Sequence, residues 1–394
     1  MNRTFKTVII TAAVTLFITR IFYGITLKPY ENEVSKKIAT INYLIQEKGL
    51  YDIDEKELAD YAAAGLTLGV NDQYTSYYSK EQFENFIENL SNGSYVIGVV
   101  VSVNDDNKIV VQSVLEDSAA QKAGIKSGDI IVEINSRIYS GEELDEAVSV
   151  MRGDGIEDIY GTELYLKLER DDKEVNLKVV REKLEYNSVK SRMVDDEIGY
   201  LRILAFNNSS EEENSKDTYD EFLEKLDGLQ NSGMEKLIID LRNNPGGSLD
   251  VVKNIADELL PKGIITYTED KDLKRIEYKS DAKELNLPIV VLVNGNSASA
   301  SEVLTGALKD YEKATIIGTK TFGKGIVQTV IPLEDGSGLS LTTSKYYTPN
   351  GVCIHGIGIE PDIYIEPNEG FDLYESSSEE DIQLQTAIKT LKNN

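Results

Sequence analysis

The chain has 394 residues, enough for two or three domains that each bury a core of their own. It carries 68 Asp and Glu against 41 Lys and Arg, and the net charge of -27 argues against binding to nucleic acid or to anionic membrane surfaces. A single cysteine, Cys353, excludes an internal disulfide framework, and a single histidine, His355, excludes a multi-histidine metal site. We therefore expect no metal and no cofactor.

The N-terminal segment, residues 1–28, is predicted to anchor the chain in a membrane. Arg3 and Lys6 precede an apolar stretch, residues 8–27, which is just long enough to span a bilayer if Arg20 reaches toward the interface. No small-residue cleavage site is evident, so an uncleaved anchor is favoured over a secretion signal. The basic start places the N-terminus in the cytoplasm and the rest of the chain outside it, or in the medium if the segment is cleaved. A buried core helix, the alternative, leaves the basic start unexplained.

Residues 29–92 are predicted to form a helical arm. The spacing of Leu58, Tyr61, Ala62 and Leu66 places them on one helix face. A break at residues 69–74 precedes a second helix around Phe83 and Phe86.

Residues 93–185 are predicted to form a compact β-rich module. Short β-rich runs occur at residues 95–103, 108–114, 130–134, 164–170 and 174–181. Residues 186–370 then alternate apolar runs with helical stretches, which indicates an α/β domain, and residues 371–394 form a C-terminal helical tail. The acidic runs 211–213 and 376–381 are expected to be solvated surface.

Three turns of the α/β domain directly follow predicted strands. They are residues 242–247, 294–301 and 318–325. Ligands of open α/β sheets gather at the carboxyl ends of strands, so these loops are expected to converge on one site.

The serine-rich turn at residues 294–302 has two interpretations. Ser299 and Glu302 fit a capping box, in which each satisfies free amides at a helix start. The same position offers an exposed hydroxyl beside helix N-terminal amides, whose dipole can stabilise an oxyanion. The sequence alone leaves both uses open.

A serine nucleophile needs a group that accepts its proton, and lysine is the better candidate. His355 has no acidic partner beside it, so it is interpreted as structural. Lys324 can act only if burial lowers its pKa from about 10.4 toward neutrality. Phe322, Ile326 and Val327 supply apolar surroundings and Lys320 a second cation, while no acidic residue occurs between residues 312 and 334. The alternative is a solvated lysine in a glycine turn.

These residues, in this order, resemble the carboxyl-terminal processing peptidases, tail-specific serine proteases with a Ser-Lys dyad. The resemblance rests on residues 297–302, 321–325 and 328, and extends to 242–247, 347–351 and 356–362. It implies a multidomain α+β protein with a crotonase-like α/β protease core. Ser299 would be the nucleophile rather than Ser297 or Ser301, with Lys324 as general base and Gln328 as the residue that orients it. The implied oxyanion hole consists of the backbone amides of Gly246, Gly247 and Ala300.

The β-rich module resembles a PDZ domain, on residues 118–125 and 128–131. PDZ domains bind a peptide as an added strand, and loop amides hold its terminal carboxylate. The matching loop is Tyr95, Val96, Ile97 and Gly98. Two departures are Ala119 in place of the usual proline and a longer loop at residues 155–161. Residues 72–75 and 77–78 resemble the N-terminal segment of the same family.

The sequence thus predicts an anchored extracytoplasmic serine endopeptidase. It would capture the free C-terminal tail of a protein substrate with its PDZ domain and cleave through an acyl-enzyme. The resemblance also suggests a homodimer and gating of the active site by PDZ occupancy. The alternatives are a catalytically silent PDZ scaffold and a hydrolase of non-peptide substrates.

Overall fold

The computed structural model divides between Tyr77 and Tyr78 into two compact units. The described residues are 32–91, 97–104, 106–114, 118–153, 161–171, 173–182, 187–209, 216–281, 283–368, 371, 373 and 377–393. The predicted anchor and the acidic run 211–213 lie outside them. Among the described residues, no helix combines the length and the apolar character needed to cross a bilayer.

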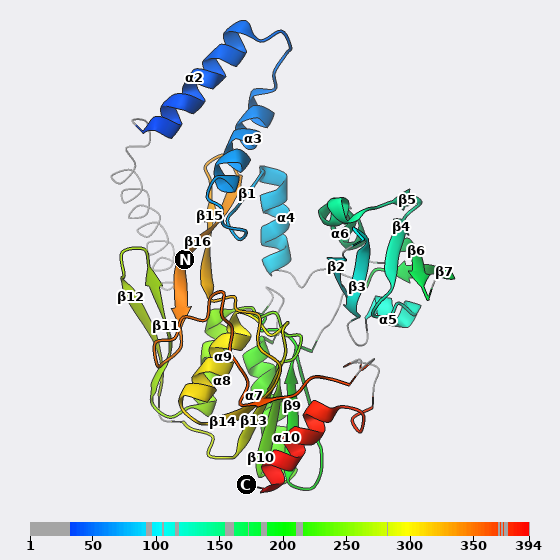
Figure 1. Cartoon of the computed structure of the whole chain (residues 1–394), viewed down its shortest axis with the longest axis vertical. Helices are drawn as coiled ribbons and strands as arrows, with labels where there is room; N and C mark the ends of the chain where they lie inside the picture. Colours follow the sequence, from blue (N-terminus) through cyan, green and yellow to red (C-terminus); the bar gives the residue numbers. More distant parts are fainter. Residues whose placement is uncertain are drawn as a thin grey trace, which may run out of the picture. The chain divides into compact units, whose positions relative to one another are not determined.

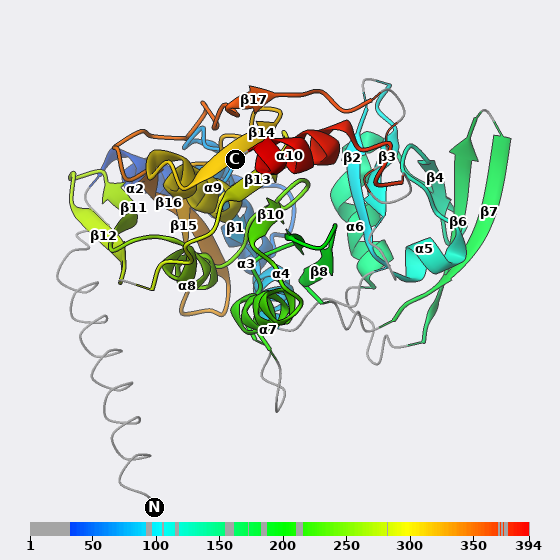
Figure 2. The ribbon, with the colours of Figure 1, turned by 90° about the horizontal axis from the view of Figure 1, so that it is seen from below.

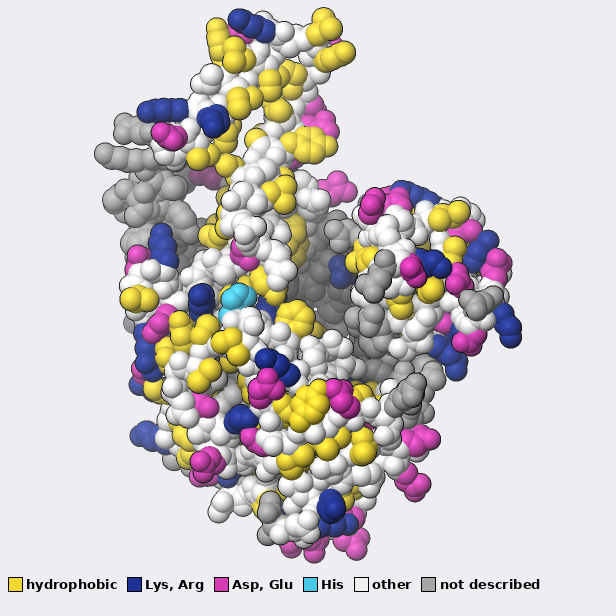
Figure 3. All heavy atoms as spheres, in the orientation of Figure 1, with side chains coloured by type: hydrophobic (Ala, Val, Ile, Leu, Met, Phe, Trp, Pro, Cys, Tyr) yellow, Lys and Arg dark blue, Asp and Glu magenta, His cyan; other side chains and the backbone are white. Residues whose placement is uncertain are grey.

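The first unit contains two helices where the sequence pattern predicted one. They are α2 (Glu33–Lys48) and α3 (Glu55–Leu68) (Figure 1). Helix α2 ends at Lys48, with Gly49 as its C-cap. Helix α3 begins where the Asp54 carboxylate accepts hydrogen bonds from first-turn amides. Neither helix buries a residue, and Leu50 and Leu68 are 87% and 82% exposed. Hydrophobic side chains are visible along these helices in Figure 3.

The boundary between the units falls within the short strand β1 (Ser76–Tyr78), and the first helix of the second unit is α4 (Lys80–Ser91). This is the helix predicted around Phe83 and Phe86. The ring of Phe86 stacks on that of Tyr78 with 4.7 Å between centroids, and Phe83 is buried.

The β-rich module is an antiparallel sheet in the order β2-β3-β4-β6-β7, with β5 paired to β4 (Figure 1). Its elements are β2 (Val99–Val103), β3 (Ile109–Val114), α5 (Ala119–Ala123), β4 (Ile130–Ile134), β5 (Arg137–Ile138), the short 3-10 turn η1 (Gly141–Glu143), α6 (Leu144–Arg152), β6 (Glu163–Arg170) and β7 (Lys173–Val180). Buried aliphatic side chains, among them Ile109, Ile134, Leu166 and Leu168, form a separate core. The predicted strands are confirmed.

The rest of the second unit is built on a six-stranded sheet in the order β17-β14-β13-β10-β9-β8. The strands are β8 (Val189–Met193), β9 (Ile198–Ile203), β10 (Lys236–Asp240), β13 (Ile289–Val293), β14 (Ala314–Gly318) and β17 (Ile363–Tyr364). All neighbours are parallel except β8 and β9. Strand β13 is buried along its whole length, as continuous apolar runs predict for strands covered on both faces.

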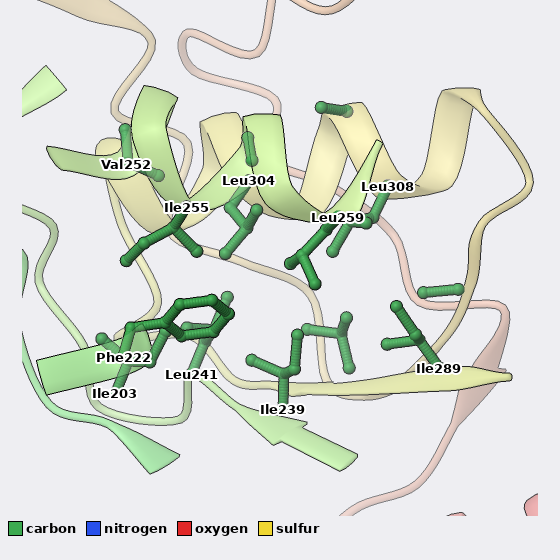
Figure 4. Packing of buried hydrophobic residues seen from close by; sticks show 14 of the residues in the cluster. Ile203, Phe222, Ile239, Leu241, Val252, Ile255, Leu259, Ile289, Leu304 and Leu308 are labelled. Carbon is green, nitrogen blue, oxygen red and sulfur yellow. The ribbon is translucent and has the colours of Figure 1, made fainter. Parts of the chain in front are cut away.

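Helices cover both faces of this sheet (Figure 2). The helices are α7 (Thr218–Asn231), α8 (Leu249–Leu259), α9 (Ala300–Asp310) and α10 (Ile382–Asn393). Ile239 and Val291 pack with the first three. The close-up of the core shows Ile239 below the side chains of α8 and α9 (Figure 4). The adjacent residues Ile238 and Val290 face the opposite way and pack with α10. The C-terminal helix is therefore part of the core.

The prediction that residues 376–381 are solvated surface is wrong at Asp381. Its side chain is buried in an ion pair with Arg242.

A second, antiparallel sheet lies beside this core. It contains β11 (Gly263–Asp270), β12 (Arg275–Ser280), β15 (Ile326–Pro332) and β16 (Gly338–Tyr347). Strand β16 pairs with both β11 and β15. Strand β15 begins two residues after Lys324, so its pairing with β16 fixes the chain that leaves the lysine.

Candidate active site

The three predicted loops meet at one edge of the large sheet. They follow β10, β13 and β14, which are adjacent and parallel, so their carboxyl ends share that edge. The Ala298 amide donates to the Asn244 carbonyl at 3.0 Å, and the Phe322 amide donates to the Ser297 carbonyl at 3.1 Å. The predicted convergence of the loops is confirmed.

Ser299 precedes the first residue of α9 in a backbone conformation that L-residues rarely adopt. Its φ is 55° and its ψ is -113°. Such a conformation costs about 1–3 kcal/mol and persists only where surrounding contacts enforce it. The predicted capping box with Glu302 is present, and the Glu302 carboxylate accepts the Ser299 amide at 3.0 Å.

The two neighbouring serines have structural partners. Ser297 is fully buried, and its hydroxyl donates to the Leu241 carbonyl at 2.8 Å. Ser301 is also fully buried, and its hydroxyl donates to the Asn244 carbonyl at 2.9 Å. Ser299 alone of the three is only half-buried. The arrangement favours Ser299 as the reactive serine.

Glu302 links the serine to the lysine loop, a role that the sequence interpretation missed. Its side chain is fully buried. One carboxylate oxygen accepts the Thr321 hydroxyl at 2.6 Å and the Gly323 amide at 2.7 Å. The other accepts the Lys324 amide at 2.8 Å as well as the Ser299 amide. The capping spacing was a visible signal for Glu302, but only the fold reveals the second loop.

Lys324 is half-buried, and burial lowers the pKa of its amine below the ordinary 10.5. The residues that were expected to lower this pKa contribute unequally. Ile326 is buried, whereas Phe322 is 56% exposed and gives little cover. Lys320 pairs with Glu360 at 2.9 Å, so its charge is balanced at the surface. Desolvation rather than a second cation therefore accounts for the direction of the shift.

Gln328 lies on β15, next to an irregularity in its pairing with β16. Its side-chain amide donates to the Ser340 hydroxyl of β16 at 3.0 Å. The orientation of Lys324 by Gln328 stays a prediction. His355 lies with its backbone against Gly325, where an added Cβ would be 2.4 Å from the His355 nitrogen.

The predicted oxyanion donors differ in availability. The Gly246 amide donates to the Asn244 side-chain oxygen at 2.8 Å, so it is occupied in this structure, and its assignment as an oxyanion donor stays a prediction. In the described part of the chain, the Gly247 and Ala300 amides donate no hydrogen bond. These two amides are therefore unoccupied, as the predicted oxyanion role requires, and that role stays a prediction.

Gly246 instead lets the two loops approach closely. Its φ is 106°, and an added Cβ would be 2.8 Å from the Ser299 Cβ and 3.0 Å from the Ala300 nitrogen. Only glycine fits this position without displacing the serine.

Two of the four predicted PDZ loop residues, Tyr95 and Val96, lie outside the described residues. Ile97 is buried, and its carbonyl accepts the Ala120 amide at 2.7 Å. Gly98 has a φ of 85°, typical of a turn that needs glycine. Ala119 is the first residue of α5, a position that proline tolerates and alanine fills equally well.

Comparisons with known proteins match both the protease core and the β-rich module. Residues 197–365 match the family model described as peptidase family S41, and residues 87–157 match that of the PDZ domain. The chain is 36% identical over 368 residues to a probable CtpA-like serine protease of Staphylococcus aureus (strain COL), covering 91% of this chain and 71% of the relative. It is 38% identical over 322 residues to a carboxy-terminal-processing protease of Bartonella bacilliformis, covering 79% and 70%.

Solved structures show the same fold. The photosystem II D1 C-terminal processing protease superposes with a TM-score of 0.64 at 27% identity, covering 84% of this chain and 87% of that one. A putative S41 protease from Bacteroides fragilis gives a TM-score of 0.56 at 17% identity, which supports the fold alone. The chain therefore belongs to peptidase family S41, as a serine protease of the carboxy-terminal-processing group that carries a PDZ domain.

Proposed function

We propose that this protein is an extracytoplasmic serine endopeptidase that captures the C-terminal tail of protein substrates with its PDZ domain and cleaves them by a Ser-Lys mechanism. The single observation that carries the mechanism is the Glu302 carboxylate, one oxygen of which accepts the amides of both Ser299 and Lys324. The two amide nitrogens are therefore no farther apart than the sum of those two hydrogen-bond lengths. Backbones this close allow the serine hydroxyl and the half-buried lysine amine to reach each other, as a nucleophile and its base must.

In the proposed reaction the neutral Lys324 amine takes the proton of the Ser299 hydroxyl, and the Ser299 oxygen attacks the carbonyl carbon of the substrate. The amides of Gly247 and Ala300 stabilise the resulting oxyanion. The lysine ammonium then gives its proton to the leaving amine as the peptide bond breaks. Water attacks the ester, Lys324 accepts the water's proton, and the Ser299 oxygen is reprotonated as the acyl group leaves.

The presence of a PDZ domain supports the proposal that the substrate has a free C-terminal tail. PDZ domains bind a peptide as an added strand beside loop amides that hold its carboxylate. Two relatives carry C-terminal processing in their names, which agrees with tail recognition. The extracytoplasmic location rests on residues 1–28 and their basic start. Digestion of the folded part by a protease added to intact spheroplasts would support it, and protection there would contradict it.

A homodimer is part of the proposal. It is supported by the helices of the first unit, which bury none of their own residues. Exposed apolar side chains on such helices are a common basis for association.

The mechanism is tested with one peptide that ends in apolar residues, prepared with a free and with an amidated C-terminus. Wild type, Ser299→Ala and Lys324→Ala are compared, with Lys320→Ala as the matched control, because Lys320 lies in the same loop but pairs at the surface. We expect cleavage by wild type and Lys320→Ala only, and faster cleavage of the free-tail peptide. Equal turnover by all four proteins would exclude the dyad.

Two further outcomes separate the parts of the proposal. Tail-dependent binding without cleavage by wild type would instead identify a binding scaffold. Deletion of residues 94–185 tests the PDZ domain, because equally fast cleavage of both peptides by the deleted form would exclude tail capture and gating together.

A further inference from the structure

A buried ion cluster joins the C-terminal helix to the loop that carries Gly246 and Gly247. Arg242 follows β10 and is 2% exposed. Its guanidinium donates to both oxygens of Asp240, and on its other side to both oxygens of Asp381 at 2.9 and 2.7 Å. Asp381 precedes α10 and caps it by accepting the Leu384 amide at 3.0 Å.

The charges of this cluster depend on one another. Burial alone would lower the pKa of Arg242, but the two carboxylates raise it well above the ordinary value. Burial would likewise raise the pKa of Asp240, but Arg242 and Arg202 lower it. Removal of one carboxylate leaves a buried guanidinium with an incomplete set of acceptors, which is costly in a dry site.

The loop after Arg242 contacts the serine turn directly. The Asn244 carbonyl accepts the Ala298 amide at 3.0 Å and the Ser301 hydroxyl at 2.9 Å. The Asn244 side chain accepts the Gly246 amide and donates to the Ile203 carbonyl at 2.9 Å. A shift of Arg242 would therefore move the Gly247 amide relative to Ser299.

Helix α10 has other means of docking on the sheet. Leu384, Ala387 and Leu391 are buried against Ile238, Val290 and Leu292. The Lys236 amine also donates to the Leu391 carbonyl at 2.9 Å. Buried ion pairs contribute little net stability compared with apolar packing, so the pair with Asp381 is better suited to fix a geometry than to hold the helix.

We infer that Asp381 is a positioning residue for the reaction: through Arg242 it sets the loop that presents the Gly247 amide to the oxyanion. This inference rests on the proposed function. It assigns to the C-terminal helix a part in catalysis, although no residue of that helix need touch the substrate.

The test compares Asp381→Asn with Asp217→Asn in the full-length protein. Asparagine retains helix-capping ability in both variants. Asp217 caps α7 on the same sheet by accepting the Asp220 amide and accepts no hydrogen bond from Arg242, so it controls for a lost carboxylate at a helix start. We expect Asp381→Asn to lower kcat about tenfold or more with KM changed less than about twofold, because misplaced catalytic groups cost rate rather than binding.

A peptide boronic acid provides a second measurement, since its adduct with Ser299 places an oxygen in the oxyanion hole. Its affinity should fall in parallel with kcat for Asp381→Asn and stay within about twofold for Asp217→Asn. Equal kcat in wild type and Asp381→Asn, or equal losses in both variants, would overturn the inference.

Hydrogen exchange over residues 241–248 tests the loop without any activity. Exchange should quicken in Asp381→Asn and stay unchanged in Asp217→Asn. Quickened exchange in Asp381→Asn, alongside a wild type that lacks peptidase activity, would refute the proposed function but not the positioning of the loop by Asp381. Unchanged exchange would refute that positioning alone. If Asp381→Asn does not fold, Gln383→Ala is used, because Gln383 accepts from the same guanidinium at 3.0 Å. It should give smaller changes of the same sign, and an unaltered loop and kcat would overturn the inference.

Discussion

Lys324 illustrates how a residue acquires a function through its surroundings. Its side chain is half-buried just before the start of β15, and desolvation penalises the charged ammonium. A neutral amine can accept the proton of a serine, whereas an ammonium cannot. The pKa of this one group therefore decides both the pH range of activity and a part of the stability.

The pH dependence of activity follows from that lowered pKa. We expect kcat/KM to rise with pH through the pKa of Lys324, which lies below 10.5. Lys324→Arg should be inactive at every pH, because a guanidinium does not lose its proton in proteins. A pH-rate profile of wild type and variant measures both. An arginine variant that keeps the wild-type profile would contradict the assignment.

Stability provides an independent measurement of the same pKa. Between the lowered pKa and about 10.5 the unfolded chain binds more protons at Lys324 than the folded chain, so folded-state stability rises with pH in that window. Relative to Lys324→Met, wild type should gain stability across the window and stay at a constant difference above it. Urea unfolding at a series of pH values tests this, and a difference independent of pH would show an unshifted pKa.

Some site residues could be predicted from residue order and others could not. The pattern around Ser299 and Lys324 indicated both groups. It did not indicate that Gly246 is occupied, although an asparagine two residues earlier is a usual partner for a turn amide. Asp381 was assigned to the surface because acidic runs usually are, and only the fold brings Arg242 to it.

At the scale of elements, the start of α9 and the loop after β14 are joined by one carboxylate. Glu302 accepts hydrogen bonds from Ser299 on its own helix and from three groups of the lysine loop. The alignment of the two elements depends on an acceptor that carries two oxygens.

Glu302→Gln should therefore lower kcat by about 10- to 100-fold, because an amide nitrogen would face backbone N–H groups. Each buried N–H left without an acceptor costs about 1–3 kcal/mol of stability. Glu221→Gln is the control, since Glu221 accepts the Val189 amide at 2.9 Å away from both loops. Steady-state kinetics and thermal melts measure the result. Equal losses of kcat in both variants would contradict the role of Glu302 in aligning the serine turn with the lysine loop.

The elements themselves were predicted unevenly. The apolar runs of β10 and β13 have a clear signal because both faces of the sheet are covered. Strands β15 and β16 mix polar and apolar side chains and are half-exposed, so the pattern did not identify them. The break between α2 and α3 was missed because a single Gly49 is a weak signal within a helical stretch.

At the scale of the molecule, the PDZ module and the protease have separate apolar cores, whereas the helices of the first unit bury no residue. Burial of apolar surface is the main source of folding free energy. Helices that bury nothing of their own gain stability from association.

We expect the full-length protein in detergent to be a dimer at micromolar concentration. Leu50→Glu combined with Leu68→Glu removes two of the most exposed apolar side chains and should weaken association by about 3 kcal/mol, or about a hundredfold in Kd. Lys56→Glu, a change at an exposed polar position of α3, is the control. Sedimentation velocity distinguishes monomer from dimer. One sedimentation coefficient for all three proteins would refute a dimer formed through the surface that contains Leu50 and Leu68.

The Glu302 contacts have a consequence for how the enzyme tolerates change. Three of its four partners are peptide N–H groups, which every residue except proline provides. The exposed Phe322, between two of the tethered positions, can thus be exchanged without disturbing the register of nucleophile and base. New substrate preferences can arise at that rim while the chemistry beneath it is inherited intact.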